Sequence, residues 1–115
     1  MTGATSARGE VWDADLGSPV GHEQAGRRPA IVVSADVFNQ GPAGLVVVLP
    51  LTSVDRRVPL HVALEPPEGG LTRPGWVKPE DVRAISTARL TRRRGIVAEQ
   101  TLEAVEARLR ALLDL

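Results

Sequence analysis

The sequence predicts a mainly β domain that ends in one helix, built as a small closed or half-closed barrel. Three observations lead there. The chain has 115 residues, which is enough for one domain. Proline and glycine interrupt the first two thirds and are absent after Gly95, so short strands come first. The last segment then carries apolar residues at helical spacing.

Short apolar runs between these breakers are the expected strands. Pro29 can only open its strand, because proline has no N–H to give to a sheet. Leu45 to Leu49 forms a continuous apolar run, which is typical of a buried strand. The expected strands are residues 8–13, 29–34, 45–49 and 60–64, short pieces at Trp76, Val77, Val82 and Ile85, and residues 94–97.

Two loops and two helical segments complete the expected layout. Residues 16–26 and 66–75 are rich in glycine and proline and predict long loops. Residues 35–40 predict a short helical turn. Residues 99–113 are the clearest helix, with an apolar stripe made of Leu102, Val105, Leu109, Leu112 and Leu113. This helix is expected to pack on the barrel or on a partner subunit and to take no part in chemistry.

Composition excludes several classes of protein. Cysteine is absent, which excludes a disulfide framework and a thiolate zinc site. No apolar run approaches the ~20 residues that span a bilayer, and residues 1–7 lack the apolar core of a signal peptide. We therefore expect a cytoplasmic protein with no membrane contact. Residues 1–7 are expected to be a flexible tail, and residues 8–115 the domain.

One segment carries the strongest functional signal. Gly21-His22-Glu23-Gln24-Ala25-Gly26-Arg27-Arg28-Pro29-Ala30, followed by an apolar strand, resembles the signature of the MazF/PemK toxins. Three further segments fit that pattern in order. They are Arg8-Gly9-Glu10-Val11-Trp12, then Val48-Leu49-Pro50-Leu51-Thr52-Ser53, then Arg83-Ala84-Ile85 with Arg89-Leu90 and Gly95. The resemblance covers residues 8–113.

The resemblance implies a fold, an activity and partners. The fold would be an SH3-like barrel that forms a homodimer. The activity would be that of a type II toxin, which cleaves single-stranded RNA at short motifs without a metal or other cofactor and so blocks translation. The products would carry 2′,3′-cyclic phosphate and 5′-hydroxyl ends. A cognate antitoxin protein would cover the RNA groove.

Three residues become candidates for catalysis through this resemblance. Arg28 lies where the first long loop becomes a strand, and a guanidinium can hold two phosphate oxygens at once. The Thr52 hydroxyl could donate to the same phosphate, and Glu23 could accept the proton of the 2′-hydroxyl. Each has a plainer alternative: Arg28 pairing with an acid at the strand edge, Thr52 capping a turn, and Glu23 solvated in its loop.

The residues around the two signature segments are candidates for RNA contact. With only three aromatic side chains in the protein, recognition should depend on base-edge hydrogen bonds and on arginine stacking more than on aromatic platforms. Trp12 is expected in the core, and Trp76 could lie in the core or on the RNA. The candidate RNA-binding residues are Gln24, Arg27, Ser53, Arg56, Arg57 and Trp76.

Other polar residues favour structural roles. His22 is expected to be a solvated loop residue and His61 a structural histidine on a strand. With no acid at ligand spacing, neither predicts a metal site. Arg92, Arg93 and Arg94 form the densest basic run, for which a solvated hairpin turn is slightly favoured over phosphate contact.

Two departures from the family pattern bear on specificity. The first loop, at Leu16-Gly17-Ser18-Pro19, is about two residues longer than the usual form. Glu80 is followed by Asp81 where many relatives have an acid and then glutamine, so a charge replaces an amide. Two other functions remain open: a barrel that binds a protein target, as the gyrase-poisoning toxins of this fold do, and an SH3-like binding module. The set of Glu23, Arg28 and Thr52 favours the nuclease.

Overall fold

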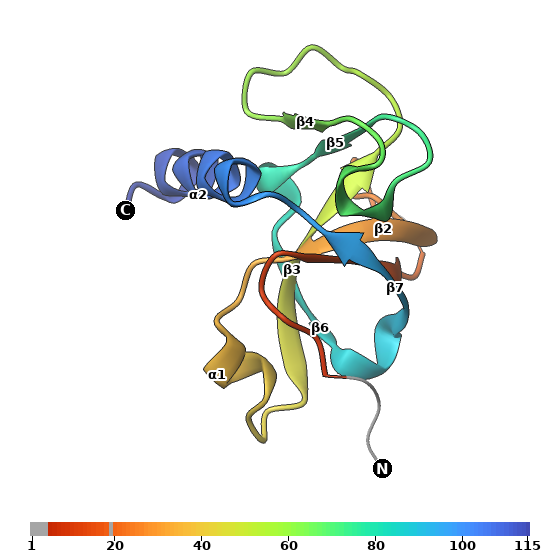
Figure 1. Ribbon diagram of the computed structural model, residues 1–115, viewed down its shortest axis with the longest axis vertical. Coiled ribbons are helices and arrows are strands. Elements are labelled where there is room, and N and C mark those ends of the chain that lie inside the picture. Colours follow the sequence, from red (N-terminus) through yellow and green to blue (C-terminus); the bar gives the residue numbers. More distant parts are fainter. Residues whose placement is uncertain (1–4, 19) are drawn as a thin grey trace.

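Seven short strands form one antiparallel sheet that curls into a half-barrel. The computed structural model describes residues 5–18 and 20–115, and Figure 1 traces its elements. The strands are β1 (Glu10–Asp15), β2 (Arg27–Val32), β3 (Leu45–Thr52), β4 (Val62–Leu64), β5 (Gly75–Val77), β6 (Arg83–Ser86) and β7 (Leu90–Ile96). The helices are α1 (Asp36–Asn39) and α2 (Glu99–Leu113), with 3₁₀ turns η1 (Glu68–Gly70), η2 (Pro79–Asp81) and η3 (Thr87–Arg89).

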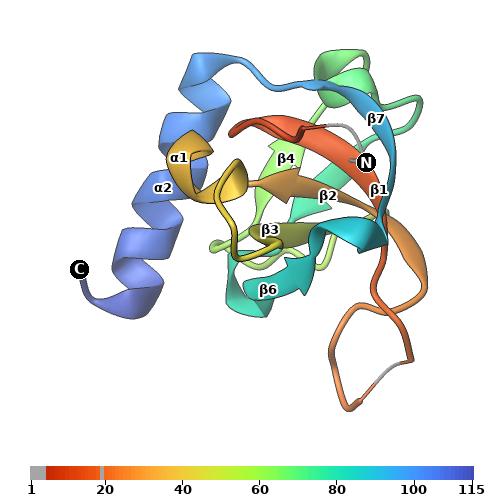
Figure 2. The same cartoon turned by 90° about the horizontal axis from the view of Figure 1, so that it is seen from below.

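Strand β3 is the organising strand of the sheet. The order across the sheet is β4-β5-β3-β2-β1-β7, and β6 also pairs with β3. Residues 45–48 of β3 pair with β6, and Leu51 and Thr52 pair with β5, so the chain from β5 through η2 to β6 runs along β3. Figure 2 shows the curl of the sheet, with α2 at its side. The predicted mainly β fold with a C-terminal helix is confirmed.

Successive residues of the central strands are buried on opposite faces of the sheet. Ile31 belongs to the apolar cluster that α2 covers, whereas Val32 belongs to a second cluster around Trp12. This alternation explains why the sequence shows continuous apolar runs, since a strand buried on both faces needs no polar positions. Trp12 is 5% exposed, as expected of a core residue.

Helix α2 has the predicted bounds but buries only part of its stripe. Val105 is fully buried, and Leu102 and Leu109 pack against the first cluster. Leu112 and Leu113 remain 40% and 51% exposed near the end of the helix. None of the helices in the described residues combines the length and the apolar character needed to cross a membrane.

Several expected strand ends were wrong, for identifiable reasons. Pro29 does not open β2, which begins at Arg27, because Pro29 lies beyond the part of β2 that pairs with β3. Val82 follows η2 and lies outside the strands. The expected solvated hairpin at residues 92–94 is part of β7 instead, because acids on β1 pair with its arginines.

The expected N-terminal tail is only partly described. Residues 1–4 lie outside the described residues. Ser6 is buried, and the Ala7 amide donates to the Glu10 carboxylate at 2.7 Å. Packing against the sheet therefore begins before residue 8.

Two glycines bring the loop after β4 into backbone contact with β7. Gly70 in η1 has a φ of 70°, and a Cβ built on it would lie 2.1 Å from the Arg94 carbonyl oxygen. A Cβ on Gly95 would lie 2.7 Å from the Gly70 nitrogen. Only glycine fits at either position, so this contact fixes the 66–75 loop against β7.

We predict that Gly70→Ala destabilises the protein by about 3 kcal/mol or more, because strain at positive φ adds to a backbone clash. The matched control is Gly44→Ala, at a φ of 67° with no atom within 4 Å of the added Cβ. It should cost only about 1 kcal/mol. Urea unfolding of both variants measures the difference, and equal losses would contradict the role of the contact.

A buried carboxylate joins β1 to β7. Glu10 is 8% exposed and accepts hydrogen bonds from the Trp12 indole at 3.0 Å and from Arg93 Nε at 2.5 Å, besides the Ala7 amide. Burial opposes ionisation of Glu10, but the Arg93 hydrogen bond, the Ala7 and Trp12 bonds and the Arg93 charge outweigh it. Together they hold the pKa of Glu10 below its usual value.

This lowered pKa makes part of the stability pH-dependent. A carboxyl whose pKa is lower in the folded state stabilises the fold above the unfolded pKa and loses that effect as pH falls through the folded pKa. We predict that Glu10→Gln costs about 2 kcal/mol at pH 7, from the loss of charged hydrogen bonds. The gap to the wild type should shrink below pH 4.5. Urea midpoints at pH 7 and pH 3 test this, and a constant gap would refute it.

Candidate functional site

The ladder between β2 and β3 ends at a pair of prolines. The last paired residues are Ala30 and Pro50, and Pro29 comes next on β2. Proline donates no hydrogen bond, so pairing stops here and the two strands separate. Arg28 comes two residues before Ala30, and Thr52 two residues after Pro50, and both residues line the opening that the separated strands leave.

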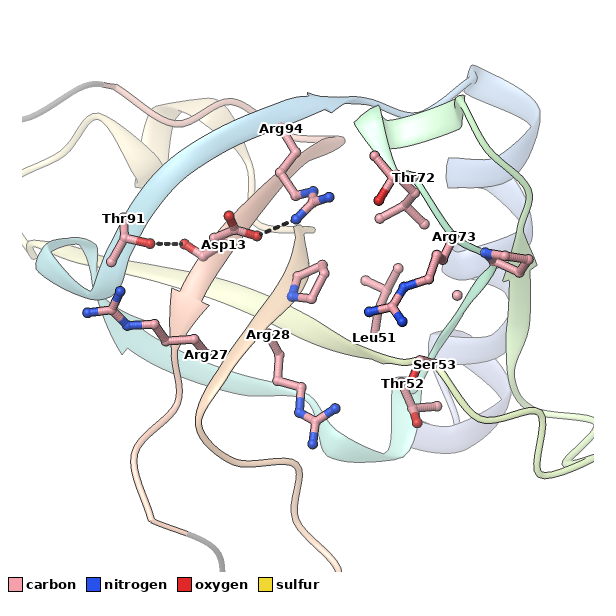
Figure 3. A pocket seen from close by; sticks show the side chains of 14 residues that line it. Asp13, Arg27, Arg28, Leu51, Thr52, Ser53, Thr72, Arg73, Thr91 and Arg94 are labelled. Atoms are coloured by element: carbon pink, nitrogen blue, oxygen red, sulfur yellow. Dashed lines mark hydrogen bonds and ion pairs between the residues drawn. The ribbon is translucent and has the colours of Figure 1, made fainter.

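A pocket of about 390 Å³ occupies the opening between the separated strands. Figure 3 shows the Arg28 and Thr52 side chains at one end of this pocket and Arg94 at the other, with Arg73 between them. We call it the arginine pocket. Its lining residues are Asp13, Arg27, Arg28, Pro29, Leu51, Thr52, Ser53, Leu71, Thr72, Arg73, Pro74, Gly75, Thr91 and Arg94.

Arg28 keeps most of its donors free. Its Nε donates to the Ala25 carbonyl at 3.1 Å, which fixes the side chain at the end of the loop. Among the described residues, no carboxylate lies within 4.0 Å of the guanidinium nitrogens of Arg27, Arg28 or Arg73. The alternative of an ion pair at the strand edge is therefore not found for Arg28. These unpaired cations give the pocket a positive field that suits an anion.

Thr52 caps a turn and also lines the arginine pocket. Its Oγ1 accepts the Val54 amide at 3.2 Å, which is the turn-capping role. The side chain is 3% exposed and also lines the arginine pocket. The capping bond uses a lone pair of the hydroxyl, so its proton remains available to donate into the pocket.

Sequence reasoning did not place five polar residues in this pocket, namely Asp13, Thr72, Arg73, Thr91 and Arg94. Thr72 and Arg73 belong to the 66–75 segment, for which only a loop is expected from the sequence. Arg94 belongs to the basic run, for which a solvated turn is slightly favoured over phosphate contact, and it lies on β7 together with Thr91. No local signal marks these residues, because their directions follow from pairing between strands.

Glu23 lies apart from Arg28 and Thr52. It lines a second hollow of about 580 Å³ together with Gln24, Arg56, His61, Lys78 and Glu80. The end of the first loop is held there by a clamp on Gln24. Asp81 Oδ2 accepts the Gln24 amide at 2.8 Å, and Arg83 donates to the Gln24 carbonyl at 2.9 Å and to Asp81 Oδ1 at 2.7 Å.

Asp81, the acid that departs from the family pattern, and its neighbour Glu80 both have partners within the protein. Asp81 completes the clamp on Gln24, and Glu80 lies 2.7 Å from Nε2 of His61. The His61 side chain is 2% exposed, and its Nδ1 is buried without a hydrogen-bond partner. His61 is thus a structural histidine with one nitrogen satisfied. Pro19 of the lengthened first loop lies outside the described residues.

The remaining candidates are divided between these regions. Arg27 and Ser53 line the arginine pocket, although Figure 3 shows Arg27 pointing toward Thr91 and away from Arg28. Neither Arg57 nor Trp76 lines either hollow. Arg57 is exposed, and Trp76 is half-buried on β5, where it pairs with Thr52. Within residues 5–18 and 20–115, no three His, Cys, Asp or Glu side chains gather in a group suited to a metal ion.

Comparison with known proteins assigns the family. Residues 7–113 match the model of the PemK-like, MazF-like toxins of type II toxin–antitoxin systems. The chain belongs to this family. It is 36% identical to the endoribonuclease MazF9 of Mycobacterium tuberculosis, over 94% of this chain and 96% of that protein.

Solved structures agree with this assignment. The MazF crystal structure from Deinococcus radiodurans has a TM-score of 0.85 and 28% identity, and covers 98% of this chain and 100% of that one. A mycobacterial endoribonuclease in complex with its cognate antitoxin has a TM-score of 0.77 and 27% identity, over 96% and 95% of the chains. The predicted family is confirmed, and with it the enzyme class of its full-length relatives, endoribonuclease.

Proposed function

We propose that this MazF-type toxin cuts single-stranded RNA with Arg28 and Thr52 at the scissile phosphate. The proposal is supported by one observation: Arg28, with free Nη donors, and the Thr52 hydroxyl line the same pocket as Arg27 and Arg73, which have no carboxylate partner among the described residues. A protein-binding module has no need of that pairing.

The reaction is a transesterification within the RNA. The 2′-oxygen attacks the neighbouring phosphorus as it loses its proton, and the bond from phosphorus to the 5′-oxygen breaks. The leaving oxygen takes up a proton. The products are a 2′,3′-cyclic phosphate and a 5′-hydroxyl. Arg28 binds the non-bridging oxygens, whose charge grows in the transition state, and Thr52 donates to the same group.

Glu23 is proposed as the base that takes the 2′-hydroxyl proton. It lies five residues before Arg28 in the loop that leads into β2, with an exposed side chain. Without RNA it lines the second hollow, but catalytic contacts often tighten only when substrate binds. Its approach to the Arg28–Thr52 pair on an RNA strand is therefore part of the proposal.

The RNA would extend from the arginine pocket to the second hollow. Arg27 and Ser53 border the first, and Gln24 and Arg56 the second. Arg57 and Trp76 flank this path and remain candidates for RNA contact. We further propose that the chain acts in the cytoplasm as a homodimer, and that an antitoxin protein inhibits it by covering the RNA path.

We predict that Arg28→Ala lowers the rate of RNA cleavage about 10²–10³-fold, because a preorganised donor to the transition state is lost. Thr52→Val should lower the rate in the same direction. The protein is incubated with a mixed RNA pool, and new 5′-hydroxyl ends are mapped. Arg110→Ala, at an exposed position on α2, is the control and should cleave at the wild-type rate, and unfolding curves check that each variant folds. Cleavage by Arg28→Ala at the wild-type rate would contradict the assignment.

Cleavage should continue in excess EDTA, because the proposed steps use side chains alone. The measurement compares the rate for a fixed RNA with and without chelator at constant ionic strength, since salt by itself weakens phosphate contacts. Activity that disappears with EDTA and returns with a divalent cation would overturn the metal-independent mechanism.

A further inference from the structure

Two β-bulges on β7 aim side chains into the arginine pocket. Val11 of β1 pairs with Gly95, and the next residue, Trp12, pairs with Arg93, so Arg94 is an extra residue without a partner on β1. The second register shift leaves Thr91 unpaired in the same way. A bulge redirects the side chain of its extra residue. Both extra residues, Arg94 and Thr91, line the arginine pocket.

The three consecutive arginines of β7 therefore have different environments. Arg93 binds the buried carboxylate of Glu10 on β1. Arg92 has a 69% exposed side chain, and its Nε lies 3.5 Å from Asp13 Oδ2. Arg94 is 17% exposed, and its Nη1 lies 2.9 Å from Asp13 Oδ1. Of the three, Arg94 alone lines the arginine pocket.

Asp13 orients Arg94 without neutralising the pocket. A guanidinium has five N–H donors in a fixed plane, and Asp13 engages Nη1 only. The pocket holds four arginines but the single carboxylate of Asp13, which Arg92 also shares. Arg73 reaches toward this space from the 66–75 loop, which the Gly70–Gly95 contact holds against Arg94.

We propose that Arg94 and Arg73 form a second phosphate subsite, which binds the RNA phosphate next to the scissile one. Asp13 is a positioning residue that holds the guanidinium plane of Arg94 toward the pocket. The scissile phosphate occupies the Arg28–Thr52 end, and the neighbouring phosphate the Arg94 end. This inference rests on the proposed RNA cleavage and adds to it the number and place of the phosphates bound.

The test uses an RNA oligomer whose cleavage site is known from end mapping. A 2′-deoxy sugar at that site prevents cleavage, and each neighbouring linkage in turn is replaced by an uncharged methylphosphonate. Replacement of one adjacent linkage should weaken wild-type binding about 10-fold, the effect of losing a charge-assisted hydrogen bond. Arg94→Gln should bind the unmodified oligomer about 10-fold more weakly and show no further loss on that replacement.

Two more variants separate positioning from simple charge. Asp13→Asn raises the net positive charge, so it strengthens binding if Asp13 merely repels phosphate, and weakens binding if Asp13 orients Arg94. We expect weaker binding. Arg92→Gln is the matched control, because Arg92 contacts the same carboxylate but points to solvent, and its binding should be unchanged. The slope of log Kd against the logarithm of the salt concentration should fall by about 0.7 in Arg94→Gln, and it should stay unchanged in Arg92→Gln.

The outcomes distinguish this inference from the proposed function. If the wild type fails to cleave the all-ribose oligomer, the proposed function fails. If it cleaves, and the wild type and a folded Arg94→Gln lose affinity equally on every replacement, the second subsite is refuted. Arg94→Lys keeps the charge without the planar fork and should restore the salt dependence, though only part of the affinity. Urea unfolding shows that each variant is folded.

Discussion

The site depends on the point where β2 and β3 stop pairing. The ladder holds the two strands in register up to Ala30 and Pro50, and the prolines then leave no donors to continue it. Beyond this point the strands separate, and Arg28 and Thr52 line the pocket that lies between them. A rigid sheet thus delivers two side chains to one place, which a loop alone would hold less accurately.

The distribution of charge, and not its sum, gives the protein its binding character. The chain has 14 basic and 14 acidic side chains. On β7 the arginines are largely matched by Glu10 and Asp13, and at the second hollow Asp81 is matched by Arg83. Around the arginine pocket, Arg27, Arg28 and Arg73 have no such partners among the described residues. A chain of zero net charge therefore gathers unpaired positive charge around one pocket.

Close packing connects the far wall of the pocket to the sheet. Gly70 and Gly95 allow the 66–75 loop to touch β7 beside Arg94, where any side chain would force the two apart. The bulges in β7 turn Arg94 and Thr91 toward the same space. Backbone irregularities, rather than the regular ladder, thus supply the residues that extend the pocket beyond Arg28 and Thr52.

Local features and the family could be predicted from the sequence. The spacing of leucines gave the bounds of α2, and the ordered signature segments indicated Arg28 and Thr52. The partners of the other charged groups could not be predicted, since a pairing such as Asp13 with Arg94 joins residues that are far apart in the chain and meet only in the folded sheet. Arg92, Arg93 and Arg94 look alike in sequence, but their directions follow from a bulge, which is set by pairing between strands and leaves no local pattern.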